Sequence, residues 1–409
     1  TGPLKGEVEI SGAKNSALPI LAACVLGTEE IILDGVPELK DVEIMIDVLK
    51  HLGSEVQYLD RNTLKINSAT IDTCETPYEL MDKMRASFVV MGPLLSRFNS
   101  AYTKAPGGCN IGSRPIDLHL KGFEALGAEN RVNNDEIAIE AKNGLLGTEI
   151  YLDFPSVGAT QNIIMAATLA KGKTTLDNAA KEPEIVDLAS FLSKMGANIK
   201  GAGTSTIVIE GVKKLTGTRH TIIPDRIEAA TYMTAAAMTR GEVTINNVIG
   251  SHIRPIIAKL VEMGVDVEEI EDDDRIIVKA PNKLKSTNIQ TLPYPGFPTD
   301  AQAQFMALMT ICEGESRIQE TVFENRFMHV EELMKMGAVI ATSGNRATIA
   351  GGADVKATDL RAGAALVMAG LVATGKTRVF DIYHIDRGYS NLVEKLTKLG
   401  ADIERVRVE

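Results

Sequence analysis

One segment of the chain combines the residue types of a reactive site with the flexibility of a loop. Residues 104–114 read Lys-Ala-Pro-Gly-Gly-Cys-Asn-Ile-Gly-Ser-Arg, so three glycines flank the thiol of Cys109 and Arg114 follows five residues later. Glycine lets the backbone approach a ligand closely, and a nearby cation favours the thiolate and attracts anions. The segment therefore suits chemistry on a small, negatively charged substrate. Taken alone, a single cysteine in a glycine-rich loop is more often an incidental surface residue.

The composition limits the classes of protein that could contain this segment. A chain of 409 residues exceeds one typical hydrophobic core, which predicts two domains. The four cysteines lie far apart and have no metal-binding spacing, which favours free thiols and predicts no metal site. The net charge of −11 argues against nucleic-acid binding. Because no apolar run has membrane-spanning length and no signal peptide is recognisable, we expect a cytoplasmic protein that does not enter a membrane.

A short phrase recurs six times, in which Leu or Met precedes a glycine and a strand-like run follows. Its glycines are Gly53, Gly127, Gly196, Gly264, Gly337 and Gly400. Each phrase predicts the end of an amphipathic helix, a glycine that terminates it, and a strand. Alanine-rich stretches precede the phrases, as at 17–26, 159–170, 229–239, 301–311 and 362–374. Because these stretches are apolar on all sides, they predict buried helices. Six such units predict two closed α/β domains of three units each, with helices inside and sheets outside.

Polar residues recur just before each predicted buried helix. Ser11, Ser156, Thr299 and Thr358 are explained as N-caps. Cations at helix starts oppose the helix dipole, so their recurrence at equivalent places indicates a function in binding anions. The cations of this set are Lys14, Arg85, Arg226, Arg326, Arg361 and Arg387. The segments 324–326 and 384–387 are expected at the starts of outer helices.

Taken in order, these motifs resemble the UDP-N-acetylglucosamine 1-carboxyvinyltransferase family of enolpyruvyl transferases. The resemblance covers essentially the whole chain and is carried by residues 6–19, 84–87, 106–119, 155–160, 224–229, 294–304, 322–327, 359–362 and 385–389. It implies a two-domain inside-out α/β barrel of the EPSP synthase type, built from six βαβαββ units. One domain is expected at 16–223, with a mobile loop around Cys109, and the second at 1–15 plus 224–409. The active site is expected in the cleft between them.

The resemblance also implies an activity. Members of the family transfer enolpyruvyl from phosphoenolpyruvate to the 3′-hydroxyl of UDP-N-acetylglucosamine and release phosphate, the first committed step of peptidoglycan synthesis. The expected partners are these two substrates, with no cofactor, no nucleic acid and no membrane, and the expected state is a monomer or weak homo-oligomer. Cys109 would be the thiol that the epoxide fosfomycin alkylates.

The roles of individual residues follow from the same resemblance. Cys109 is expected to be the general acid, and Asp300 the general base or the acceptor that orients the sugar hydroxyl. The phosphate clamp would be Lys14, Arg114 and Arg387, with further anion contacts from Arg326 and Arg361 and a hydrogen bond from Asn15 near the reacting centre. The nucleotide-sugar contacts would be Arg85, Arg114, Pro115, Ile116, Asp117, Leu118 and the backbone of Val322, with Ser156, Val157 and Gly158 near the diphosphate. Some members carry a lysine where this chain has Phe154, so one cation is missing there.

Three other interpretations differ from this one in chemistry. The first is enolpyruvyl transfer to shikimate 3-phosphate, but the enzymes that catalyse it lack the loop around Cys109. The second is a nucleotide-sugar-binding paralogue without catalysis, against which the presence of Lys14, Cys109, Asp300 and Arg387 argues. The third is a thiol hydrolase with Cys109 as nucleophile, for which His119 and His384 are the open partners.

Overall fold

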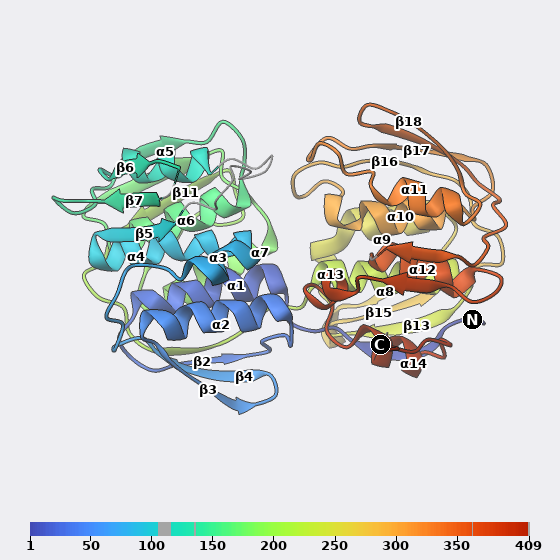
Figure 1. Ribbon diagram of the computed structural model, residues 1–409, viewed down its shortest axis with the longest axis horizontal. Helices are drawn as coiled ribbons and strands as arrows, with labels where there is room; N and C mark the ends of the chain where they lie inside the picture. Colours follow the sequence, from blue (N-terminus) through green and yellow to red (C-terminus); the bar gives the residue numbers. More distant parts are fainter. Residues whose placement is uncertain (105–115, 135, 362, 408–409) are drawn as a thin grey trace. The chain divides into compact units, whose positions relative to one another are not determined.

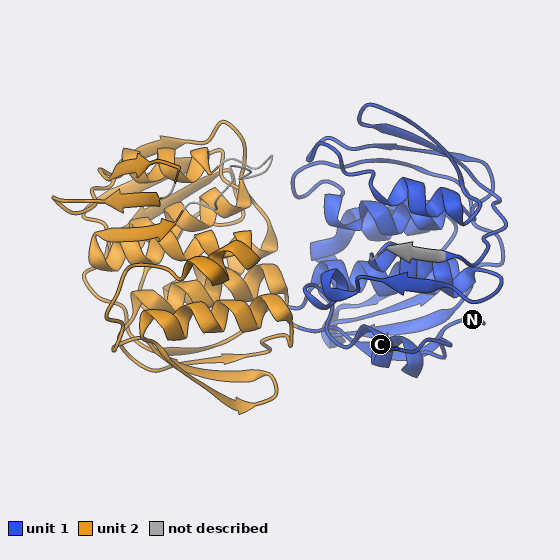
Figure 2. Ribbon diagram, in the orientation of Figure 1, with its two compact units in different colours: residues 1–11, 224–409 blue, residues 12–223 orange. Residues whose placement is uncertain are grey.

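The computed structural model describes residues 1–104, 116–134, 136–361 and 363–407. They form two compact units, each with its own hydrophobic core (Figures 1 and 2). Unit 1 comprises Thr1–Ser11 and Pro224–Glu409, and unit 2 comprises Gly12–Ile223. The division falls four residues before the expected one, so that Lys14 and Asn15 belong to unit 2.

Unit 2 contains three repeats, each with an interior and an outer helix. The interior helices are α1 (Lys14–Ala23), α4 (Met91–Phe98) and α6 (Val157–Thr168), and shorter helices beside them are η1 (Cys24–Leu26), α3 (Tyr78–Lys83) and η2 (Arg85–Val90). The outer helices are α2 (Lys40–Leu52), α5 (Asp117–Ala125) and α7 (Pro183–Lys194). The strands are β2 (Ile31–Asp34), β3 (Glu55–Asp60), β4 (Thr63–Asn67), β5 (Ser100–Lys104), β6 (Glu129–Val132), β7 (Glu136–Glu140), β8 (Glu149–Tyr151), β9 (Lys173–Asp177), β10 (Asn198–Lys200), β11 (Thr206–Glu210) and β12 (Thr218–Thr221).

Unit 1 repeats the same order of elements. Its interior helices are α8 (Arg226–Met238), α10 (Gln302–Met309) with the preceding turn η5 (Thr299–Ala301), and α12 (Ala364–Val372). The outer and short helices are η3 (Gly250–Ile253), α9 (Arg254–Glu262), η4 (Glu271–Asp273), α11 (His329–Lys335), α13 (Tyr383–Asp386) and α14 (Leu392–Lys398). The strands are β1 (Lys5–Glu9), β13 (Glu242–Asn246), β14 (Asp266–Ile270), β15 (Arg275–Lys279), β16 (Asn288–Gln290), β17 (Glu315–Gln319), β18 (Val339–Ser343), β19 (Arg346–Ala350), β20 (Asp359–Arg361) and β21 (Arg378–Phe380).

The four-stranded sheets share one topology, in which the first strand of a repeat pairs in parallel with the second and the last two pair antiparallel. Among the described residues, the second repeat has a three-stranded antiparallel sheet, β5-β7-β6, and the sixth has only the parallel pair β20-β21. In the third repeat β8 runs parallel to β9, and β9 and β10 flank β11 antiparallel. Two strands depart from the order of the chain. β1 precedes α1 of unit 2 but pairs with β13 of unit 1, and β12 precedes α8 of unit 1 but pairs with β2 of unit 2. The chain therefore passes from one unit to the other twice, and both connections are short.

The glycine of each repeat occupies the left-handed conformation that ends the outer helix, as predicted. The φ angles of Gly53, Gly127, Gly196, Gly264, Gly337 and Gly400 lie between 94° and 115°. The second repeat lacks the glycine that follows the interior helix elsewhere. There Asn99 ends α4 with φ 58°, because asparagine tolerates this conformation better than other non-glycine residues.

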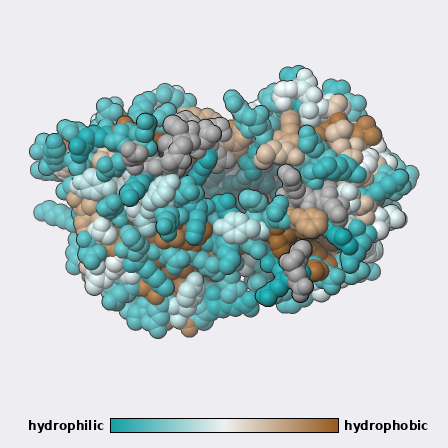
Figure 3. Space-filling model, in the orientation of Figure 1, coloured by the Kyte–Doolittle hydropathy of each residue, from teal (hydrophilic) through white to brown (hydrophobic). Residues whose placement is uncertain are grey.

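The interior helices are buried almost throughout, which confirms the prediction from their composition. In α8 every residue from Glu228 to Met238 is buried, and in α6 every residue from Ala159 to Thr168. The face drawn in Figure 3 is covered mainly by hydrophilic residues, with small and scattered apolar patches. Among the described residues, no helix is both long enough and apolar enough to span a membrane.

Candidate active site

The structure does not describe three of the expected site residues, nor the side chain of a fourth. Cys109, Arg114 and Pro115 lie outside the described residues, and of Arg361 only the backbone, at the end of β20, is described. The remaining candidates divide between the units. Lys14, Asn15, Arg85, residues 116–118 and residues 156–158 lie in unit 2, and Asp300, Val322, Arg326 and Arg387 lie in unit 1.

In unit 2 the candidates lie at the starts of helices that contact one another. Lys14 and Asn15 begin α1, Arg85 begins η2, and Asp117 begins α5 directly after Ile116. Val157 begins α6, whose N-cap is Ser156: its hydroxyl accepts a hydrogen bond from Ala159 N at 3.2 Å. Because α1 and α6 both pack against η2, and α5 packs against α6, these starts belong to neighbouring elements. Helix starts expose unpaired N–H groups and therefore favour anions.

Lys14 is held by a carboxylate from the neighbouring outer helix. Its Nζ lies 3.3 Å from Oδ2 of Asp41, which is buried in the first turn of α2. The side chain of Lys14 is 27% exposed, whereas that of Asp41 is 3% exposed. The ammonium group therefore points from a buried anchor toward solvent, which is a suitable arrangement for a cation that binds a phosphate.

One amide connects the helices that carry the candidates of unit 2. Asn162 of α6 accepts from Gly92 N at 2.8 Å, and its Nδ2 donates to Phe88 O at 3.2 Å and lies 2.8 Å from Nδ1 of His119. Since Nδ2 can only donate, Nδ1 of His119 is the acceptor and the ring is neutral. Burial lowers the pKa of His119 to about 4. His119 is therefore a poor general base at neutral pH, which argues against the thiol-hydrolase interpretation with this residue.

Gly158 allows His119 to lie against the start of α6. A Cβ atom at this position would stand 3.0 Å from Cε1 and 3.2 Å from Nε2 of the imidazole. A side chain at this position would require the imidazole of His119 to shift by a few tenths of an ångström. The glycine of the expected diphosphate segment thus has a packing role beside any contact with a ligand.

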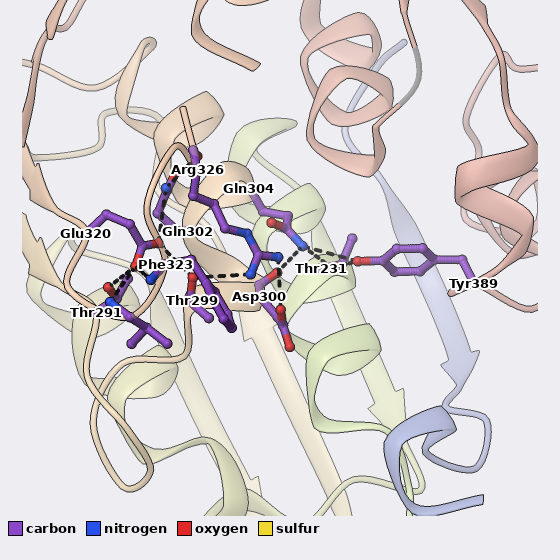
Figure 4. A network of polar contacts seen from close by, with 11 residues as sticks. Thr231, Thr291, Thr299, Asp300, Gln302, Gln304, Glu320, Phe323, Arg326 and Tyr389 are labelled. Atoms are coloured by element: carbon purple, nitrogen blue, oxygen red, sulfur yellow. Dashed lines mark hydrogen bonds and ion pairs between the residues drawn. The ribbon is translucent and has the colours of Figure 1, made fainter. Parts of the chain in front are cut away.

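In unit 1 the structure brings Asp300 and Arg326 together (Figure 4). Asp300 lies in η5, and its Oδ1 accepts a hydrogen bond from Nη2 of Arg326 at 3.0 Å. The guanidinium of Arg326 also donates to Thr299 Oγ1 at 3.4 Å and lies 5.2 Å from the centroid of the Phe323 ring. Both charged side chains are partly exposed, 41% for Asp300 and 35% for Arg326. The pair therefore orients an accessible carboxylate more than it stabilises the fold.

A second amide connects Asp300 to the segment of Arg387. Gln304 Nε2 is within 3.1 Å of the backbone oxygen of Asp300, Thr231 Oγ1 and Tyr389 Oη, and the two hydroxyls lie 2.8 Å apart. Burial raises the pKa of Tyr389, so its hydroxyl stays protonated. Figure 4 shows Gln304 and Tyr389 reaching toward Thr231 from different elements. The interior of unit 1 thus connects the turn of Asp300 to a residue two positions after Arg387.

The expected place of Arg387 is wrong. It does not begin an outer helix, because α13 ends at Asp386 and α14 begins only at Leu392. Arg387 therefore follows a helix C-terminus, where a cation is favoured by the dipole, and its charge alone gives no argument for anion binding. Arg326 does precede its outer helix, three residues before the start of α11.

Three of the expected N-caps cap no helix. Thr358 directly precedes strand β20, and the residue before α12 is Gly363. Ser11 caps no helix, because α1 begins after Ala13; its Oγ accepts from Lys395 Nζ at 2.8 Å. Lys395 also pairs with Glu228, a buried carboxylate of α8. Burial raises the pKa of Glu228 to about 7, although Lys395 opposes this effect. Thr299 donates to Glu320 Oε1 at 2.7 Å instead of capping η5.

Sequence reasoning missed the polar residues that hold the candidates: the buried Asp41, Asn162, Gln304 and Glu320, and the partly buried Tyr389. An available signal was the presence of amides within otherwise apolar helices, since buried polar groups require partners. The partners themselves come from distant parts of the chain. Among the described residues, no group of three or more His, Cys, Asp or Glu side chains could hold a metal ion.

The repeated fold and the comparison with known families identify the class as the enolpyruvyl transferases. The family model described as EPSP synthase (3-phosphoshikimate 1-carboxyvinyltransferase) matches residues 1–396, and the chain belongs to this family. The enolpyruvyl transferase NikO from Streptomyces tendae has a similar structure, with a TM-score of 0.89 at 26% identity over 98% of this chain and 96% of that one. EPSP synthase from Acinetobacter baumannii shares the fold, with a TM-score of 0.78 at 17% identity.

Within this class, the chain is closely similar in sequence to relatives named UDP-N-acetylglucosamine 1-carboxyvinyltransferase. The chain is 67% identical over 411 residues to a UDP-N-acetylglucosamine 1-carboxyvinyltransferase of Finegoldia magna, which covers 99% of this chain and 97% of the relative. It is 59% identical to UDP-N-acetylglucosamine 1-carboxyvinyltransferase 1 of Caldanaerobacter subterraneus subsp. tengcongensis, over 98% of this chain and 97% of the relative.

Proposed function

We propose that this protein transfers the enolpyruvyl group of phosphoenolpyruvate to the 3′-hydroxyl of UDP-N-acetylglucosamine and releases inorganic phosphate. The observation that carries the proposal is the 67% identity, over nearly the full length of both chains, to a relative named for this reaction. The geometry of Lys14, Asp300 and Arg326 is consistent with it, since the reaction needs cations for a phosphate and a carboxylate near a hydroxyl. In the cell the reaction would begin peptidoglycan synthesis in the cytoplasm.

The first step is an addition that requires an acid and a base together. A proton from Cys109 would go to the methylene carbon of phosphoenolpyruvate, while the 3′-oxygen forms a bond to the neighbouring carbon. The hydroxyl proton would pass to Asp300, whose Oδ1 is already held by Arg326. The product is a tetrahedral ketal that still carries the phosphate.

The second step is an elimination that reverses the proton transfer at the same carbon. The methyl group would lose a proton to the Cys109 thiolate left by the first step, the carbon–oxygen bond to phosphate would break, and the double bond of the enolpyruvyl group would form. The departing phosphate would take up the proton that Asp300 accepted, so that both residues return to their starting states. Lys14, Arg114 and Arg387 would stabilise the charge on the departing phosphate. Arg326 and Arg361 would contact the remaining anionic groups, and Asn15 would hydrogen-bond near the reacting carbon.

The nucleotide sugar would be held mainly by residues 114–118 and Arg85, with the diphosphate at the start of α6. Phe154, which is 44% exposed, provides no cation there, so the N–H groups of residues 156–158 would take a larger part. Val322 donates its N–H to Glu320 Oε2 at 3.1 Å. We therefore assign its contact with the sugar amide to its carbonyl oxygen.

An assay of phosphate release tests the proposal. Wild-type protein with phosphoenolpyruvate and UDP-N-acetylglucosamine should release phosphate and form the enolpyruvyl nucleotide sugar, detected by mass spectrometry. Shikimate 3-phosphate in place of the nucleotide sugar should give no product. Phosphate release with shikimate 3-phosphate as the acceptor, but not with the nucleotide sugar, would identify the sister activity. Binding of the nucleotide sugar without phosphate release would identify a non-catalytic paralogue.

A further inference from the structure

A buried carboxylate with no assigned role lies directly beside the Asp300 turn. Glu320 follows strand β17 and is 3% exposed. Its two oxygens accept hydrogen bonds from five donors, two hydroxyls, one side-chain amide and two backbone N–H groups: Thr291 Oγ1 at 2.5 Å, Thr299 Oγ1 at 2.7 Å, Gln302 Nε2 at 3.4 Å, Val322 N at 3.1 Å and Phe323 N at 3.4 Å.

Four of these five donors, all except Thr291, belong to two segments that both carry candidate site residues. Thr299 immediately precedes Asp300, and Val322 itself is a candidate contact to the sugar amide. Gln302 extends the connection, because its Nε2 also donates to the backbone oxygen of Arg326 at 3.1 Å. Figure 4 shows the carboxylate of Glu320 between Thr291 and the side chains that lead to Asp300 and Arg326. One side chain therefore fixes the turn before α10 relative to the loop before α11.

The hydrogen bonds keep this carboxylate ionised. Burial alone would raise the pKa of Glu320, but the bonds from Thr291, Thr299 and the backbone of Val322 and Phe323 outweigh it and lower the pKa. Other charged or titratable groups near the network are Asp300, Arg326 and His329. Arg326 lowers the pKa of His329, and Glu320 raises it. A buried charge with so many donors is costly to replace, because each donor would lose its partner.

We propose that Glu320 is a positioning residue for the nucleotide-sugar side of the reaction, holding the Asp300 carboxylate and the Val322 backbone in a fixed relation. It acts through the hydrogen bonds of Thr299 and Val322 and does not itself touch a substrate. The inference rests on the proposed function, because it assigns the two positioned groups to the sugar hydroxyl and the sugar amide.

The variant Glu320→Gln tests the role. In glutamine, one of the two carboxylate oxygens is replaced by an NH2 group. In the place of Oε1 this group would face Gln302 Nε2, and in the place of Oε2 it would face the N–H groups of Val322 and Phe323. In either orientation, donors would face donors and at least one hydrogen bond would be lost. We expect KM for UDP-N-acetylglucosamine to rise and kcat to fall, with a combined loss of about 10- to 100-fold, as for other small displacements of reacting groups. KM for phosphoenolpyruvate should stay within about twofold, since it reports a separate set of contacts.

Glu228→Gln is the matched control. Glu228 is equally buried in unit 1, but its hydrogen bonds go to Ser11 and Lys395 and not to the segments of Asp300 or Val322. We expect it to alter the unfolding temperature and to leave both KM values unchanged. Thr299→Val is a milder second variant, which removes the bond from Thr299 to Glu320 and the longer one from Arg326 to Thr299, and leaves the Glu320 carboxylate in place. It should show the same selective rise in KM for the nucleotide sugar. If Glu320→Gln does not fold, this variant tests the positioning role in its place.

The outcomes separate the inference from the proposed function. Absence of phosphate release by the wild type would refute the function before any variant is compared. With an active wild type, folded Glu320 and Thr299 variants whose KM for the nucleotide sugar is unchanged would overturn the positioning role. An equal rise in both KM values would overturn it as well, because it would indicate a general loosening of unit 1.

Discussion

At the scale of single residues, the charged candidates are held by defined polar partners, of which Asp41 and Glu320 are buried. Asp41 holds Lys14, Arg326 holds Asp300, and Glu320 holds the turn and the loop around Asp300. Side chains fixed in this way need little reorganisation when charge develops on a substrate, which is the condition for electrostatic catalysis. The free-energy cost of burying a charge thus falls on Asp41 and Glu320, which take no part in the proposed reaction.

The role of Cys109 can be tested by substitution. If the thiol only delivers a proton, Cys109→Asp should retain activity, because a carboxylic acid also delivers a proton. Cys109→Ser should lose most activity, since a hydroxyl is a much weaker acid. Phosphate release measures both variants, and Cys109→Asp should resist inactivation by fosfomycin. A Cys109→Asp protein that binds both substrates but is inactive would indicate a covalent role for the thiol.

Lys14 provides a second prediction at this scale. Lys14→Ala removes a cation from the proposed phosphate clamp, so kcat/KM for phosphoenolpyruvate should fall by about 100-fold or more. Lys65→Ala is the control, because Lys65 forms an exposed ion pair with Glu30 in the same unit and contacts no candidate residue. Steady-state kinetics at varied phosphoenolpyruvate compares them. Similar kinetics for Lys14→Ala and wild type would remove Lys14 from the clamp.

At the scale of elements, the end of each outer helix depends on a left-handed glycine. The six glycines share this backbone conformation, but their surroundings differ. A Cβ at Gly53 would stand 2.5 Å from Thr70 O, whereas a Cβ at Gly400 would meet nothing within 4 Å. The two positions therefore separate backbone strain from steric overlap.

Gly53→Ala and Gly400→Ala form a matched pair. Both have a φ near 100°, at 115° and 94°, so both substitutions should cost about 1–2 kcal/mol of stability for the left-handed conformation. Gly53→Ala should cost more, because the new methyl group overlaps the backbone of residues 70–72. Denaturant unfolding measures the difference. Equal losses would mean that the 70–72 segment moves away freely.

At the scale of the whole molecule, each unit has a separate core and one histidine that burial keeps neutral. The pKa is lowered to about 4 for His119 of unit 2 and for His329 of unit 1, mainly by burial and for His329 also by Arg326. In the unfolded chain both would titrate at about 6.5. The folded protein thus binds fewer protons than the unfolded chain between these values, and both units should lose stability in acid.

The expected pH dependence follows from the sign of these shifts. The histidines contribute stability above pH 6.5 that is lost as the pH falls toward about 4. Glu228 acts oppositely, because its raised pKa adds stability at low pH that is lost as the pH rises through about 7. The unfolding temperature of His119→Gln/His329→Gln should therefore fall less between pH 7 and 4 than that of the wild type. If the unfolding temperatures of the variant and the wild type fell equally between pH 7 and 4, the loss of stability in acid could not be assigned to these two histidines.

Local patterns in the sequence predicted the repeat, the buried helices and the glycines that end the outer helices. These features could be read because each depends on neighbouring residues: an apolar helix must be buried, and a left-handed position requires glycine. The candidates Lys14 and Arg326 were recognised for a similar reason, since cations at helix starts stand out within a few residues, whereas Asp300 was assigned through the family resemblance. The order of the motifs then identified the family.

Only the tertiary structure decided which partners these residues have. Ser11 bonds with Lys395, 384 positions away, and β1 and β12 pair in the unit that does not contain their following helix. Glu320 collects donors from Thr291 to Phe323, and Arg387 proves to follow a helix instead of beginning one. Contacts of this kind depend on how distant segments pack. Their energies come from burial and hydrogen bonding between those segments, which no local pattern of residues encodes.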